Sequence, residues 1–196
     1  MGRRGVPQPE HTGTGSSAGP RMPGEPTATL AVLKPTESRP HPVRAILYGA
    51  LAVAVLDALD AMLFFGIARG VRPMAIFQSI AAGLLGRAAF RGGLPTALLG
   101  GVLHFIVATC IVSTYCVVSR RIHGLARRPW LYGPLYGILV FFTMRFVVVP
   151  LSAALQGPLT LPLFLNGVIG HAILVGPPAA LAARAIARAR PTGAST

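Results

Sequence analysis

Charged residues are scarce in this chain of 196 residues: they make up 12% of it, and only five are Asp or Glu. An ordinary soluble domain has about a quarter of its residues charged. Hydrophobic residues make up 53% of the chain, and the mean hydropathy is +0.62. This balance excludes a typical soluble domain and indicates an integral membrane protein.

Cysteine is nearly absent, which excludes a disulfide framework. The two cysteines, Cys110 and Cys116, are six residues apart. In one predicted helix they lie about 9 Å apart along the axis and on different faces, so they are poorly placed to bridge. We interpret both as small apolar helix residues.

Soluble catalytic motifs are also missing: the chain has no P-loop, H-E-x-x-H or C-x-x-C. Three of the acids, Glu10, Glu25 and Glu37, lie in the polar N-terminal segment. Ser113 and Ser152 are nucleophile candidates only in the loosest sense. We therefore expect neither enzyme activity nor a bound cofactor.

Basic residues outnumber acids, with a formal net charge of +13. In a soluble protein this charge would suggest nucleic acid. Here most basic residues stand at the ends of apolar runs, without interleaved aromatics, which is typical of membrane topology. The predicted partner is the lipid bilayer, and no nucleic acid is expected.

The composition divides the chain into three parts. Residues 1–42 are rich in Gly, Pro, Ser and Thr and are predicted to form a disordered cytoplasmic tail. Residues 43–190 form the transmembrane helical domain, and 191–196 a disordered C-terminus. Arg3 and Arg4 are not followed by an apolar run, so no cleavable signal peptide is expected.

Four apolar runs are long enough to cross the ~30 Å hydrocarbon core of a bilayer as helices. They cover roughly 44–69, 95–119, 131–150 and 161–186. A fifth stretch, 74–90, contains Gln78 and Arg87 and has apolar residues at spacings of three and four. This pattern favours a short interfacial or re-entrant helix. The predicted fold is an all-α bundle of four transmembrane helices with one such short helix.

The distribution of arginine decides between four crossings and five. With four, the N-terminal segment, the loop near 120–130 and the C-terminus share one side and carry six, four and three basic residues. With five, the last two of these groups would lie outside. The positive-inside rule therefore predicts four crossings of a bacterial plasma membrane, with both termini in the cytoplasm.

The first apolar run contains two carboxylates, Asp57 and Asp60. Their spacing of three puts both on one side of a helix. A charge near the bilayer centre costs between about 3 and about 10 kcal/mol on an isolated helix, so both must face protein or water.

Ionisable and amide side chains also occur in the outer half of the other predicted helices. Counting inward at ~1.5 Å per residue puts Asp60, His104 and His171 at nearly one depth, with Asp57 one turn deeper. The candidate polar layer comprises Asp57, Asp60, His104, Arg145, Asn166 and His171.

Three interpretations of this layer remain open. The first is structural: an Asp–Arg145 pair and histidine hydrogen bonds fix the order of the helices. The second is a proton, ion or small-solute path, in a transporter or channel component that would act as a homo-oligomer because four short helices enclose little volume. The third is a metal- or haem-binding redox site built on the histidines.

Short motifs stand at 78–86, 92–93, 104–105, 119–121 and 149–152. Over roughly residues 44–188 they resemble a family of small bacterial four-span inner-membrane proteins with no assigned function. The resemblance implies membrane residence and the same helix count, and it supplies no activity. The family usually has Asn where Arg145 stands here, so an Asp–Arg145 pair would be particular to this chain.

Overall fold

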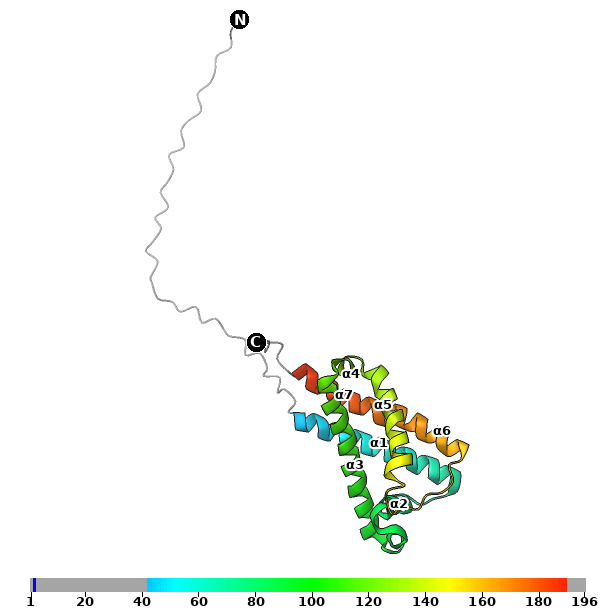
Figure 1. Cartoon of the computed structure of the whole chain (residues 1–196). Coiled ribbons are helices and arrows are strands. Elements are labelled where there is room, and N and C mark those ends of the chain that lie inside the picture. The colour runs from blue at the N-terminus through cyan, green and yellow to red at the C-terminus, as the bar shows by residue number, and fades with distance from the viewer. Residues whose placement is uncertain (1, 3–41, 190–196) are drawn as a thin grey trace, which may run out of the picture. The chain divides into compact units, whose positions relative to one another are not determined.

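The computed structural model describes residue 2 and residues 42–189 (Figure 1). The predicted C-terminal disorder over 191–196 lies outside the described residues, as does almost all of the predicted tail. Pro42, which the prediction placed in the tail, already begins the first helix. Within 42–189 every regular element is a helix, which confirms the all-α class.

The helical elements follow one another with short connections. In chain order they are α1 Pro42–Arg69, α2 Pro73–Leu85, the 3₁₀ segment η1 Gly86–Arg91, α3 Gly93–Arg121, α4 His123–Arg127, α5 Pro129–Thr143, the π-helical segment η2 Met144–Val148, α6 Leu161–Gly170, the π-helical segment η3 His171–Val175, and α7 Gly176–Ala189. The α5 and η2 segments form one continuous helix, as do α6, η3 and α7.

Five helices of the described chain are long and apolar enough to cross a membrane. Four are α1, α3, α5–η2 and α6–η3–α7, and the fifth is α2–η1 with the lowest mean hydropathy, 1.2. By length and composition alone, α2–η1 also qualifies as a membrane-spanning helix. The relative direction of the helices before and after it has to distinguish four passes from five.

The contacts between α1 and α3 settle this direction. Gly49, early in α1, faces Val112, whereas the Ala54 carbonyl further along α1 meets His104, which precedes Val112 in α3. The two helices are therefore antiparallel. A full crossing by α2–η1 between them would have made them parallel, so the four long helices make four passes. Accordingly, α1 begins and α7 ends at the same end of the bundle (Figure 1).

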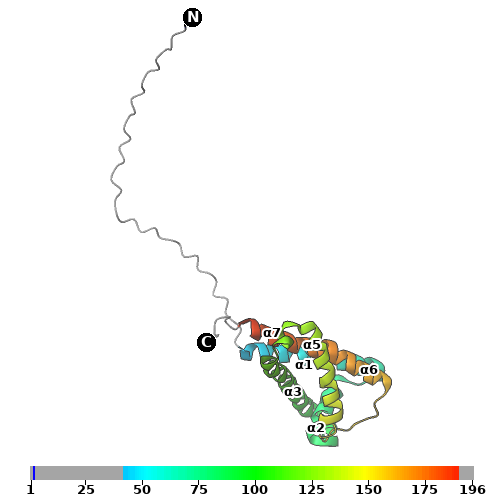
Figure 2. The same cartoon turned by 45° about the horizontal axis from the view of Figure 1, so that its top comes forward.

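The short helix α2 packs against the first turns of α3, at the opposite end of the bundle (Figure 2). Gly100 of α3 touches the Phe77 carbonyl of α2, an approach that any Cβ at position 100 would block. Buried Gln78 donates a hydrogen bond to the Gly93 carbonyl at 3.0 Å. The location of α2 agrees with the expected short helix over 74–90.

The bundle core is built largely from small residues, and α7 packs against α1, α3 and α5. Gly133 of α5 faces Pro177, and Gly137 lies directly on the His171 backbone. Small residues let membrane helices approach closely, because packing rather than the hydrophobic effect holds them together in lipid. Gly133 and Gly137 therefore mark the seam between α5 and the last long helix.

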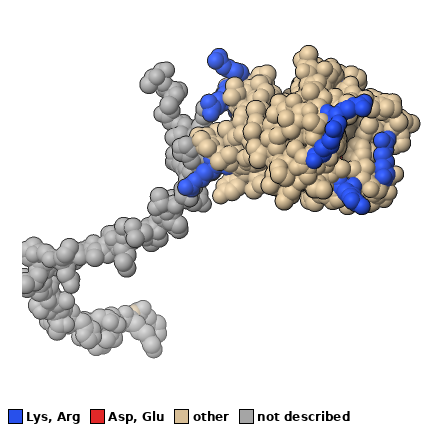
Figure 3. Space-filling view, turned by 90° about the horizontal axis from the view of Figure 1, so that it is seen from below, with Lys and Arg blue, Asp and Glu red and all other residues tan. Residues whose placement is uncertain are grey.

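Large apolar side chains cover the outside of the bundle. Examples that are about half exposed or more are Leu51, Leu59, Leu98, Leu139 and Ile173. In the view of Figure 3, the arginines gather toward the two ends and leave an uncharged band between them. Such a band in water would be a large exposed apolar patch, whereas in a bilayer it faces acyl chains. The chain is thus a multi-pass helical membrane protein.

Candidate functional site

Asp57 lies between two imidazole rings that come from other helices. Its Oδ2 is 3.9 Å from Nε2 of His104 on α3, and its Oδ1 is 3.9 Å from Nδ1 of His171, the first residue of η3. These contacts are electrostatic, because N–H···O hydrogen bonds are ~2.7–3.2 Å long. Each becomes an ion pair only when its imidazole is protonated.

His104 makes its hydrogen bond to the backbone of α1. Its Nε2 lies 3.0 Å from the Ala54 carbonyl oxygen. A carbonyl can only accept, so this bond requires the proton on Nε2. The same ring nitrogen therefore ties α3 to the α1 backbone and faces the Asp57 carboxylate one turn further along.

Asp60 contacts the beginning of the last long helix. The side-chain amide of Asn166 on α6 donates a hydrogen bond to Asp60 Oδ2 at 2.9 Å. Gly170, one turn on from Asn166, leaves room for the carboxylate, since a Cβ there would stand 2.9 Å from Oδ2. Asp60 and Asn166 thus join α1 to α6 across the seam beside Gly170.

These contacts form two groups separated by one turn of α1. We call the five side chains the aspartate cluster: Asp57, Asp60, His104, Asn166 and His171. Counting from the helix ends placed Asp60 level with both histidines, but in the structure Asp57 faces them. The difference arises because such counting assumes parallel, unstaggered helices, whereas close packing at glycine sets the actual offset between helices.

Arg145 lies apart from the aspartate cluster. Its Nη2 donates to the Gly157 carbonyl at 3.0 Å, and its own carbonyl accepts a hydrogen bond from Gln156 at 2.9 Å. The ion pairs among residues 42–189 join histidines to Asp57 and do not include Arg145. The considered Asp–Arg145 pair is not formed. The Arg145 guanidinium is held instead by the backbone of the connection between η2 and α6.

The third long helix contributes an apolar wall to the cluster instead of a charge. Phe141 of α5 packs edge-on against the His171 ring, with centroids 5.7 Å apart. Its side chain also fills the space beside Gly167 on α6. Aromatic edges of this kind orient an imidazole by packing and leave its nitrogens for polar partners.

Asp57 and the two histidines are only partly covered. The side chains are 26% exposed for Asp57, 16% for His104 and 21% for His171. They are neither sealed in the core nor spread over the outer surface. A partly covered carboxylate between two imidazoles can hold or pass a proton if water reaches it.

Among the residues that the structure describes, no group of three His, Cys, Asp or Glu side chains is placed to ligate a metal ion.

Both π-helical segments include candidate residues: His171 begins η3, and Arg145 is the second residue of η2. A π turn widens the helix and is frequent at functional sites. Sequence reasoning missed these turns, together with the roles of the Ala54 carbonyl, Gly170 and Phe141. Pro177 and Pro178 were a usable signal for η3, since each lacks the N–H that a regular helix needs one turn upstream.

Comparison of the chain with known proteins finds no matching family model, no similar curated protein and no similar solved structure.

Proposed function

We propose that the aspartate cluster is a structural lock that holds α1, α3 and α6–α7 in register within the outer half of a bacterial plasma membrane. The observation that carries this is the position of Asp57, with one carboxylate oxygen 3.9 Å from an imidazole of each neighbouring helix. The protein is non-enzymatic in this proposal, and its family is the one that its sequence motifs resemble.

The physical argument is the cost of polar groups in lipid. A carboxylate left without partners near the bilayer centre costs several kcal/mol, so the helices gain by arranging donors around it. His104 and Asn166 bring hydrogen bonds to α1 from two different helices. Each bond adds a directional constraint that the apolar seams lack, and together they favour one order and register of helices.

The test is the stability of Asp57→Asn in detergent. The neutral amide removes the charge that faces both imidazoles, and we expect the free energy of unfolding to fall by about 1–2 kcal/mol, as for strong polar contacts between membrane helices. Thr114→Ala is the matched control, because the Thr114 hydroxyl is exposed and bonds only to its own helix, at Cys110. Unchanged stability of Asp57→Asn would overturn the structural role.

A second candidate is a proton or small-solute path through the cluster in a homo-oligomer. The observation that favours it is the partial exposure of Asp57, His104 and His171, between 16% and 26%. Here Asp57→Asn would leave stability unchanged and abolish the flux, which a pH-sensitive dye inside proteoliposomes can follow. The two candidates therefore predict opposite results for the same variant.

A haem between the histidines is the remaining alternative from the sequence. An absorbance scan of the purified protein tests it directly, because a haem with histidine ligands gives a strong Soret band. A Soret band lost in His104→Ala would replace the structural lock by a redox site.

A further inference from the structure

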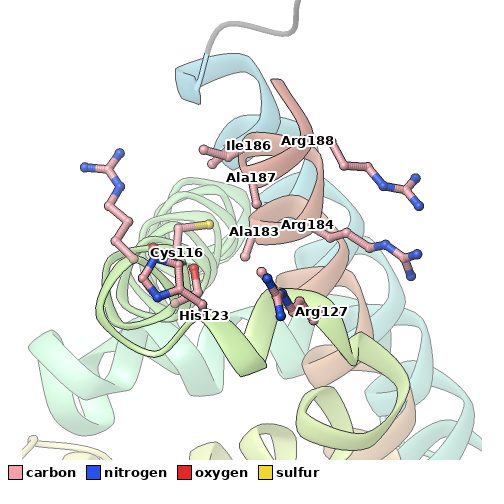
Figure 4. A pocket seen from close by; sticks show the side chains of 11 residues that line it. Cys116, His123, Arg127, Ala183, Arg184, Ile186, Ala187 and Arg188 are labelled. Carbon is pink, nitrogen blue, oxygen red and sulfur yellow. Dashed lines mark hydrogen bonds between the residues drawn. The ribbon is translucent and has the colours of Figure 1, made fainter. Parts of the chain in front are cut away.

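A basic pocket lies at the end of the bundle where α1 begins and α7 ends, far from the aspartate cluster (Figure 4). It is formed by the last turns of α3, by α4 and by the last turns of α7, and its volume is about 650 Å³. The cationic side chains of its lining are Arg120, Arg127, Arg184 and Arg188, with His123 beside them.

No acid balances these arginines within the described part of the chain. The only carboxylates of residues 42–189 are Asp57 and Asp60. Gly49 lies against Ala182 at the level of the pocket, and Asp57 is eight residues beyond Gly49, about 12 Å deeper along α1. The arginines make no hydrogen bond or ion pair with any other side chain of 42–189. Within residues 42–189 the pocket therefore carries positive charge that no carboxylate balances.

The walls of the pocket are apolar, unlike its cationic rim. Ala126, Ala183 and Ile186 are buried around it, and the Ser119 hydroxyl is already used on the Cys116 carbonyl. In the view of Figure 4, Arg184 and Arg188 project from α7 on the side away from Cys116 and His123, and Arg127 comes from α4. A ligand that fits must combine an anionic group for the rim with apolar or weakly polar parts for the walls.

Aromatic residues beside the pocket point to the depth of lipid headgroups. Trp130, which is 69% exposed, stands at the start of α5 just after α4, and the Tyr132 ring lies 4.0 Å from a Cβ position at Gly124 of α4. Tyr and Trp mark the interface between headgroups and acyl chains. Basic pockets between helices at this level bind anionic lipid headgroups.

We propose that this pocket binds the phosphate of an anionic phospholipid, with the glycerol and upper acyl chain against its apolar wall. The volume of about 650 Å³ favours a lipid headgroup over inorganic phosphate alone, since pockets of ~300–1,000 Å³ hold ligands of drug size. The inference is independent of the aspartate cluster, which lies elsewhere in the bundle.

The test compares two charge-matched variants of the full chain. Arg127→Gln with Arg184→Gln removes two charges from the pocket, and Arg87→Gln with Arg91→Gln removes two from η1 at the other end. Binding is measured by native mass spectrometry of the detergent-solubilised protein with phosphatidylglycerol, and with phosphatidylcholine as the zwitterionic reference.

We expect the wild type to retain phosphatidylglycerol in preference to phosphatidylcholine. In the pocket variant this preference should fall by about 10- to 30-fold, because each arginine near the membrane surface contributes roughly a tenfold effect or less. The η1 variant should keep the wild-type preference for phosphatidylglycerol. Equal losses in both variants would show bulk electrostatics only, and no preference in the wild type would overturn the site.

Two further experiments test the place of binding and the kind of anion bound. Ala187→Leu fills the pocket without changing its charge and should also reduce retention of phosphatidylglycerol. Unchanged retention would overturn the pocket as the binding place.

Inorganic phosphate at millimolar concentration should displace the lipid poorly. Displacement by phosphate at low concentration, or equally tight binding of phosphate alone, would assign the site to a soluble anion and overturn the lipid.

Discussion

At the scale of single residues, the closest helix contacts depend on glycines with no room for a side chain. Gly137 of α5 lies directly on the backbone of His171, so any Cβ there must separate two helices. Gly66 of α1 has open space, since its nearest neighbour beyond its own helix is the Val71 carbonyl at 3.8 Å from a Cβ position. The two glycines thus provide a matched pair for substitution.

We expect Gly137→Ala to lower the free energy of unfolding by about 1–3 kcal/mol, the usual cost of overpacking. Gly66→Ala should be neutral or stabilise by up to about 1 kcal/mol, because alanine favours helix over glycine. Both can be measured by unfolding in mixed micelles. If Gly137→Ala is as stable as the wild type, the seam between α5 and η3 is looser than the structure shows.

A second residue-scale prediction concerns Asn166. Asn166→Ala removes the side-chain amide that donates a hydrogen bond to Asp60 Oδ2 at 2.9 Å. We expect a loss of about 1–2 kcal/mol, since the carboxylate keeps its desolvation cost without that partner. A double-mutant cycle with Asp60→Ala measures the coupling, and additive effects would mean that the hydrogen bond contributes nothing to stability.

At the scale of elements, a polar network fastens α2 and η1 to the start of α3. Buried Gln78 donates to the Gly93 carbonyl and to Thr96 Oγ1, and the Thr96 hydroxyl lies 2.7 Å from the Ala89 carbonyl of η1. The network replaces the regular backbone hydrogen bonds that are missing at the turn between η1 and α3. It therefore holds α2 and η1 against the start of α3.

We expect Gln78→Leu to loosen α2–η1 selectively, because it leaves the Gly93 carbonyl and the Thr96 hydroxyl with one donor fewer. Hydrogen exchange followed by mass spectrometry should show faster exchange over 73–91 and no change in α1. Ser79→Ala is the control, since the exposed Ser79 hydroxyl bonds only within α2, to Ile76. Equal exchange in both variants would remove the network as the element that holds α2.

At the scale of the whole molecule, the antiparallel order of the long helices implies four passes, with α2–η1 at the end opposite to residues 42 and 189. The short connection between α3 and α5 then lies on the other side of the membrane from Gly92. From the positive-inside rule we expect that connection, with Arg120, Arg121, Arg127 and Arg128, to lie in the cytoplasm.

We expect reporter fusions at Gly92 and at Gly124 to report opposite sides, with Gly124 in the cytoplasm. Alkaline phosphatase activity, which needs an oxidising compartment, should appear for the Gly92 fusion alone. Activity from the Gly124 fusion alone would invert the proposed orientation. Both fusions on one side would contradict four passes.

The helical class and the number of passes could be predicted from the sequence because both depend on summed properties. Apolar runs long enough for the bilayer, and arginines at their ends, report length and charge without any knowledge of packing. The isolated carboxylates Asp57 and Asp60 could likewise be expected to face the interior, because lipid excludes them whatever their neighbours are.

The partners of those carboxylates were decided only by the tertiary structure. Which residue meets Asp57 depends on the rotation and stagger of each helix, and these are set by backbone contacts at Gly137 and by the π turns η2 and η3. His104 and His171 reach Asp57, while Arg145 bonds to the Gly157 carbonyl. Helix periodicity shows which residues share a face of one helix, but it does not show how far that helix is shifted along its neighbour. The sequence alone could therefore not show whether a histidine or Arg145 would meet Asp57.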